Sequence, residues 1–166
     1  MPFTPFHLGP ALAIGLPLRR YLHAPTFILA NLIVDVEPLM ALLAGRGPLH
    51  GFFHTLLGAT VLALILAAVM VVLEELLGGF FKALRLEEER LRPTAYLAAA
   101  LSGTWLHVLL DATMYPDVRP LWPSAYNPLY HPAALTVPVY AFCVLTAILG
   151  LAIYVAILVR PRPKHH

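Results

Sequence analysis

The chain has 166 residues, of which 60% are hydrophobic and only 12% charged, and its mean hydropathy is +0.77. Soluble domains carry about 25% charged residues, so this composition excludes an ordinary soluble domain and predicts a membrane protein. The net charge of +2 is too small for a nucleic-acid-binding surface, and no nucleic-acid partner is expected. The length predicts one domain, residues 1–164, followed by His165 and His166, which resemble a purification-tag remnant.

Apolar segments dominate the chain and predict an all-α fold. The first is short for a membrane span, which needs about 20 residues. The second contains Asp35 and Pro38, and Pro38 is expected to kink or break it. We therefore predict a polytopic bundle of about five transmembrane helices, over residues 5–18, 25–44, 50–77, 94–114 and 133–159. Residues 80–92 predict a short amphipathic helix on the surface.

The basic residues predict how this bundle is oriented in the membrane. Nine of them fall in segments that an up-and-down bundle places on one side, and two fall on the other. Cytoplasmic loops carry the excess of Lys and Arg, so the N-terminus is expected outside and the C-terminus in the cytoplasm of an inner or plasma membrane. The nine are Arg19, Arg20, Lys82, Arg85, Arg90, Arg92, Arg160, Arg162 and Lys164; the two are Arg46 and Arg119.

Histidine and aspartate residues collect at the predicted outer ends of the helices. Asp35 lies in an apolar segment with no basic residue nearby, and a carboxylate buried there needs a compensating partner. The pairs His50/His54 and His107/Asp111 have i,i+4 spacing, which places each pair on one helix face. The expected metal ligands are His7, Asp35, His50, His54, His107, Asp111 and His131.

Imidazole and carboxylate ligands suit Zn²⁺, with Mn²⁺ or Fe²⁺ as alternatives, and seven of them allow one or two ions. Such ions activate water for hydrolysis. Asp111 is expected to bridge two ions, and Asp35 to act as a ligand or general base. Glu37 is a weaker candidate base, because on a continuous helix it points roughly 200° away from Asp35.

The outer loop over residues 115–132 is rich in aromatic residues and proline. It has two interpretations: an aromatic belt at the membrane interface, or a semi-rigid lid over the metal. Arg119 is its only basic residue, so it is the expected contact for a phosphate group. The predicted catalytic residues are therefore Asp35, Asp111 and Arg119.

Four stretches occur in order within residues 1–115: MPFTPFHLGPA, NLIVDVEP, HGFFHT and WLHVLLD. Together they resemble the small membrane-bound, metal-dependent hydrolases that include the YdjM-like inner-membrane hydrolases. The ligand order is also similar to that of zinc-dependent phospholipase C and the P1-type nucleases. That similarity implies ligands at His7, Asp35, His50 or His54, His107 and Asp111. Of the later ligands, only His131 has a match, and the terminal glutamate ligand has none.

The sequence thus predicts a hydrolase with its site at the extracytoplasmic face, acting on a lipid or lipid-linked phosphoester. Membrane lipids are its expected partners, and an oligomer is possible. Two other functions remain open. A metal-ion or proton transporter would use the same cluster, but it should show polar residues continuing to the cytoplasmic face. A structural membrane protein would use the cluster only as a hydrogen-bond network.

Overall fold

A computed structural model describes residues 5–45, 49–86 and 91–160, and its regular structure there is helical, with no strand. The all-α prediction is confirmed for this part of the chain. The tag prediction at His165 and His166, and Arg46, fall outside the described residues. In chain order the elements are η1 (Pro5–His7), α1 (Leu8–Gly15), α2 (Ala24–Ile33), α3 (Val36–Ala44), η2 (Phe52–His54), α4 (Leu56–Ala83), α5 (Pro93–Ala112) and α6 (Pro132–Val159).

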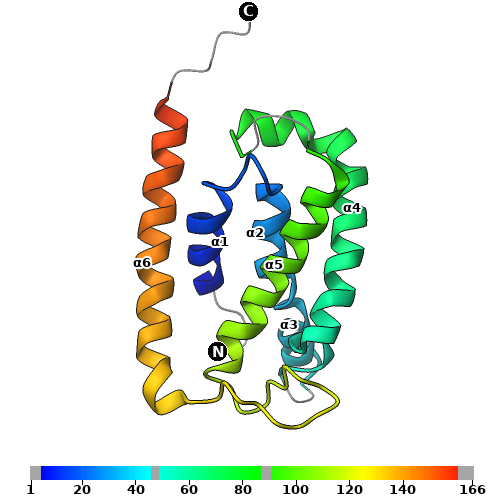
Figure 1. Cartoon of the computed structure of the whole chain (residues 1–166), viewed down its shortest axis with the longest axis vertical. Helices are drawn as coiled ribbons and strands as arrows, with labels where there is room; N and C mark the ends of the chain where they lie inside the picture. The colour runs from blue at the N-terminus through cyan, green and yellow to red at the C-terminus, as the bar shows by residue number, and fades with distance from the viewer. Residues whose placement is uncertain (1–4, 46–48, 87–90, 161–166) are drawn as a thin grey trace, which may run out of the picture.

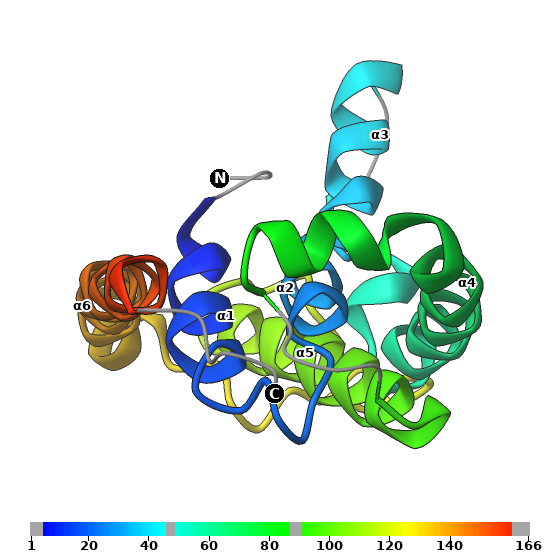
Figure 2. The same ribbon diagram turned by 90° about the horizontal axis from the view of Figure 1, so that it is seen from above.

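The helices α1, α2, α4, α5 and α6 run roughly along one axis and alternate in direction (Figure 1). The starts of α1, α4 and α6 therefore lie at the same end as the last residues of α2 and α5. Helix α3 departs from this pattern: it turns away from the bundle and projects from it (Figure 2). We call the end that carries α3 and the loop before α6 the site end.

Among the described residues, three helical stretches are long and apolar enough to cross a membrane: Ala24–Ala44, Leu56–Ala83 and Pro132–Val159. They support a membrane protein. Helix α1 has eight residues, about 12 Å at 1.5 Å per residue, so the first apolar segment is short, as predicted.

The second apolar segment is two helices, with the interruption at Val34 and Asp35. Pro38 accounts for its position, because a proline ring collides with the carbonyl four residues earlier, which here is that of Val34. The amides of Asp35 and Glu37 make shorter-range bonds, to the carbonyls of Leu32 and Val34. The break expected from Pro38 is thus confirmed, and it places Asp35 at a helix junction.

Helix α4 corrects the expected surface helix over residues 80–92. The helix continues to Ala83, and its last turns lie across the end of the bundle opposite the site end (Figures 1 and 2). Gly78 and Gly79 lie in this part of α4, and paired glycines are a common cause of helix kinks. Residues 80–83 are therefore the end of a long helix; residues 87–90 lie outside the described part.

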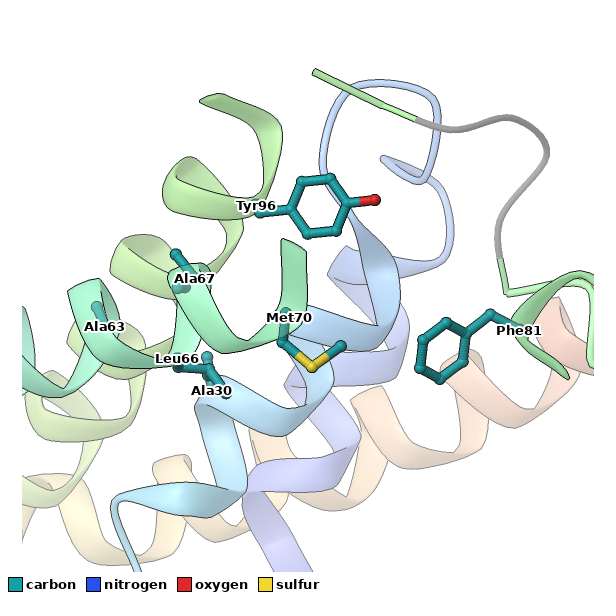
Figure 3. Packing of buried hydrophobic residues seen from close by; sticks show 8 residues of the cluster. Ala30, Ala63, Leu66, Ala67, Met70, Phe81 and Tyr96 are labelled. Atoms are coloured by element: carbon teal, nitrogen blue, oxygen red, sulfur yellow. The ribbon is translucent and has the colours of Figure 1, made fainter. Parts of the chain in front are cut away.

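Small side chains let the helices approach closely. The largest apolar cluster lies between α2, α4 and α5 and is half alanine, with Met70, Tyr96 and Phe81 filling the remaining space (Figure 3). Helix α6 packs against α1 through glycines: a Cβ on Gly9 would lie 2.2 Å from the Cys143 carbonyl oxygen, and one on Gly150 would lie 2.6 Å from the Leu12 Cβ. Such small-residue contacts are typical of helices in lipid.

Candidate metal centre

Four of the seven predicted ligands converge at the site end. Asp35, His54, His107 and Asp111 each offer one ligand atom, and these four atoms all lie within 4.8 Å of one another. We call these residues the ligand group. They come from three parts of the chain: the α2–α3 junction, η2, and two positions one turn apart on α5. All four side chains are buried, and the two aspartates are each 3% exposed.

Three of the distances within the ligand group fall in the range of the edges of a metal coordination sphere. His107 Nε2 lies 3.3 Å from Asp111 Oδ2 and 3.6 Å from Asp35 Oδ1, and His54 Nε2 lies 3.6 Å from Asp111 Oδ2. A tetrahedral ion with ligands at about 2.0–2.2 Å has edges of roughly 3.3–3.6 Å. A separation of 3.6 Å is too long for a hydrogen bond. The spacing thus fits a shared cation better than a hydrogen-bond network.

Both histidines of the group are held through the nitrogen that faces away from it. His54 Nδ1 donates to Glu37 Oε2 at 3.0 Å, and His107 Nδ1 donates to the Asn31 carbonyl at 2.7 Å. A carboxylate and a carbonyl only accept hydrogen bonds, so Nδ1 carries a proton, and Nε2 of the neutral ring presents a lone pair. Both Nε2 atoms are buried without a hydrogen-bond partner. Metal-ligating histidines are commonly oriented in this way.

The charge balance also fits a cation. Asp35 and Asp111 are buried close together, and among the described residues their ion pairs are with histidines. Two buried carboxylates repel each other and lose their hydration, which costs several kcal/mol each unless a positive charge compensates. A divalent ion supplies that charge, and carboxylate and imidazole are ligands that Zn²⁺, Mn²⁺ and Fe²⁺ accept.

His7 lies beside the ligand group, on the other oxygen of Asp111. Its Nε2 lies 3.1 Å from Asp111 Oδ1, and its ring stacks on that of His107 with centroids 3.9 Å apart. The carboxylate of Asp111 therefore faces the ligand group with Oδ2 and His7 with Oδ1. This geometry is compatible with the prediction that Asp111 bridges two ions. His7 would then be a ligand of the ion at Oδ1.

The local structure around His50 and His54 differs from the prediction. The two residues do not share a helix face, because α4 begins only after them: Thr55 caps it by accepting a hydrogen bond from the Gly58 amide at 2.9 Å. His54 ends the short helix η2. Gly58 lets η2 fold against α4, since a Cβ there would lie 1.9 Å from the Phe52 carbonyl oxygen. His54 reaches the ligand group from this turn.

His50 lies at the edge of the site rather than in the ligand group. Its ring contacts that of His54, with centroids 4.6 Å apart, and its Nδ1 donates to Asp117 Oδ1 at 2.8 Å. Its backbone amide also donates to Asp117. Partial burial by itself raises the pKa of Asp117, but these hydrogen bonds outweigh it and lower the pKa below its usual value. The Asp117 carboxylate therefore stays charged and fixes the His50 ring.

Two predicted site residues lie away from the ligand group. His131 is exposed at the start of α6, where its amide donates to the Thr113 carbonyl. It is not brought to the other histidines, because the chain leaves the site there to begin a helix that packs on α1. Arg119 is exposed in the loop before α6 and lines a cavity together with His50 and Asp117.

The sequence did not reveal three groups that hold the histidine rings in place, nor a second buried pair of ionisable residues. Asn31 and Asp117 were not considered for the site, and Glu37 was placed facing away from Asp35. At the opposite end of the bundle, His23 Nε2 lies 3.2 Å from Glu74 Oε2, and both residues are buried. The signal for this pair was a pair of acidic residues, Glu74 and Glu75, late in an apolar segment.

The chain matches no protein-family model, and neither the curated proteins nor the solved structures give a match. The interpretation of the site therefore rests on the geometry of its residues.

Proposed function

We propose that this chain is a membrane-embedded, metal-dependent hydrolase whose ligand group binds one divalent transition-metal ion, most suitably Zn²⁺, with Mn²⁺ and Fe²⁺ as alternatives. A second ion would need His7 and the other oxygen of Asp111, which lie 3.1 Å apart. One observation carries the proposal: two buried histidines direct Nε2 atoms that have no hydrogen-bond partner toward two carboxylates at coordination-sphere distances, with Nδ1 held from behind.

A bound ion of this kind supplies an acidic water and polarises a phosphoryl or carbonyl oxygen. Three ligands leave a position free for water in catalytic zinc sites, and the ligand group offers His54, His107 and Asp111 for that role. Asp35 lies at the α2–α3 junction, and we assign it either as a fourth ligand or as the base that accepts the proton of the attacking water. Burial excludes bulk solvent from the group and strengthens each of these electrostatic contacts.

The proposed substrate is a lipid or lipid-linked phosphoester, cleaved at the extracytoplasmic face. The described basic residues of the predicted inner side lie in segments at the end opposite the ligand group (Figure 1). The positive-inside rule then places the ligand group outward. Because the ligand group lies near the ends of the helices, we infer that it is at the depth of lipid headgroups. The resemblance of four stretches to small membrane-bound hydrolases supports the same class of reaction.

Elemental analysis tests the metal. Protein purified in detergent is expected to retain a transition metal in near-stoichiometric amount, and His107→Ala and Asp111→Ala are expected to lose it. His131→Ala is the matched control, because His131 is exposed and away from the group. Native protein without metal, or both variants at full occupancy, would contradict the proposal.

A transporter for metal ions or protons is the second candidate, and the buried His23–Glu74 pair at the opposite end favours it. Between the two ends lies the apolar cluster of Ala30, Met70 and Ala100 (Figure 3), which disfavours a polar route through the bundle. Flux measurements in proteoliposomes separate the two functions. Zinc or proton flux that Glu74→Gln abolishes would support the transporter and overturn the hydrolase.

A further inference from the structure

Beside the ligand group the structure has a cavity of about 320 Å³, within the range of small-molecule sites, roughly 300–1,000 Å³. We call it the Arg119 cavity. It is adjacent to the candidate metal centre, because His50 lines it while its ring contacts that of His54. The lining residues are His50, Gly51, Phe52, Thr55, Asp117, Arg119 and Trp122.

The cavity has one unpaired charge. The carboxylate of Asp117 is engaged by the ring and the amide of His50, and the hydroxyl of Thr55 by the Phe52 carbonyl and the Gly58 amide. The guanidinium of Arg119 has no hydrogen bond or ion pair with the residues that the structure describes. A guanidinium offers five N–H donors in a planar fork that matches a phosphoryl group.

The rim of the cavity is aromatic. Phe52 and Trp122 are each nearly half exposed, and their rings meet edge to face with centroids 5.6 Å apart. Trp is favoured at the membrane interface, where one part of the side chain is in lipid and another in water. Within the part of the chain that the structure describes, the cavity therefore combines an apolar wall with one cation free of hydrogen bonds and ion pairs, next to a site proposed to act on phosphoesters.

We propose that the Arg119 cavity binds the phosphoryl group of an anionic ligand, with Arg119 as the direct contact and Phe52 and Trp122 packing against the apolar part of the molecule. This inference deepens the proposed function, because it names the binding site of that substrate. The same chemistry fits a lipid headgroup and a free phosphate ion. The aromatic rim favours the lipid.

Binding measurements on chelator-treated protein in detergent test the cavity without relying on the metal. Inorganic phosphate and dihexanoyl phosphatidate are titrated separately by calorimetry. The native chain is expected to bind at least one of them, and Arg119→Gln to weaken that binding about tenfold or more, since a charge-assisted hydrogen bond contributes more than a neutral one. Arg119→Lys should retain part of the affinity. Trp122→Ala should weaken the binding of phosphatidate but not that of phosphate. If Trp122→Ala weakens only the binding of phosphate, the assigned role of the rim is overturned.

Arg92→Gln is the matched control, because Arg92 is also exposed but precedes α5 at the opposite end of the bundle. It removes the same charge and should bind both ligands as the native chain does. Equal affinity in the native chain and Arg119→Gln, or equal loss in Arg119→Gln and Arg92→Gln, would overturn the inference. So would failure of the native chain to bind either ligand.

The two proposals fail separately. If the protein never holds metal but binds a phosphoryl group through Arg119, the proposal for the cavity stands and the proposed hydrolase is overturned. Metal held by the ligand group with no Arg119-dependent binding would overturn the cavity alone.

Discussion

Glu37 offers the sharpest test of how the metal centre is held. Its carboxylate accepts hydrogen bonds from three donors: Oε2 from His54 Nδ1 and the Gly51 amide, both at 3.0 Å, and Oε1 from the Phe53 amide at 3.1 Å. In Glu37→Gln one oxygen becomes an NH₂ group, which faces at least one of these N–H donors instead of accepting from it. Even where the remaining oxygen faces His54 Nδ1, the neutral amide accepts more weakly than the carboxylate, so the His54 ring is directed less firmly to the ligand group.

The magnitude follows from these contacts. Loss of an outer-shell partner of a metal ligand typically lowers metal affinity 10- to 100-fold, or about 1.4–2.7 kcal/mol. An unsatisfied N–H adds a folding cost of about 1–3 kcal/mol. The Glu37 side chain is 20% exposed, so water offsets part of that cost and the lower half of the range is expected.

Metal affinity is measured by competition with a chelator of known strength, and stability by thermal unfolding of the metal-free protein. Glu74→Gln is the matched control, because Glu74 is also a buried glutamate paired with a histidine, but at the opposite end. It should lower stability and leave metal affinity unchanged. The reasoning is refuted if Glu37→Gln binds metal within twofold of the native chain, or if Glu74→Gln weakens binding equally.

The remaining predictions concern packing and topology. Gly9→Ala should lower the free energy of unfolding by about 1–3 kcal/mol, because its Cβ would collide with the Cys143 carbonyl in the α1–α6 contact. A Cβ at Gly79 meets nothing within 4 Å, so Gly79→Ala should leave thermal stability unchanged or raise it by about 0.4–1 kcal/mol. Equal effects of the two variants in thermal unfolding would contradict the described packing. A membrane-impermeant maleimide should label Ser124→Cys on intact cells but Lys82→Cys only after permeabilisation, and the reverse pattern would invert the topology.

Helix limits were predictable where composition and proline agree. The last two predicted segments, residues 94–114 and 133–159, match α5 (Pro93–Ala112) and α6 (Pro132–Val159) within one or two residues. Each begins at a proline, which is favoured in the first turn of a helix because its missing N–H is not needed there. The start of α4 was misplaced, because the apolar pattern runs on through η2 while the cap at Thr55 starts the helix later.

The ligand group was only partly predictable. His107 and Asp111 follow from their spacing on one helix, and Asp35 from the cost of burying a carboxylate. Glu37 was considered only as a weaker base, because the angular argument along one helix gives no information on its hydrogen bond to His54 Nδ1, which depends on tertiary structure. Asp117 comes from an irregular loop without periodicity, and its pairing with His50 depends on tertiary structure that no local pattern encodes.

The interruption between α2 and α3 determines which nitrogen of His107 carries a proton. In an unbroken helix the Asp35 amide would donate to the Asn31 carbonyl. It donates instead to the Leu32 carbonyl, at 3.2 Å, and the Asn31 carbonyl accepts from His107 Nδ1. The proline at position 38 thus frees a backbone acceptor on α2, and that acceptor selects the histidine tautomer on α5. An interruption in one helix thus orients a candidate metal ligand on another.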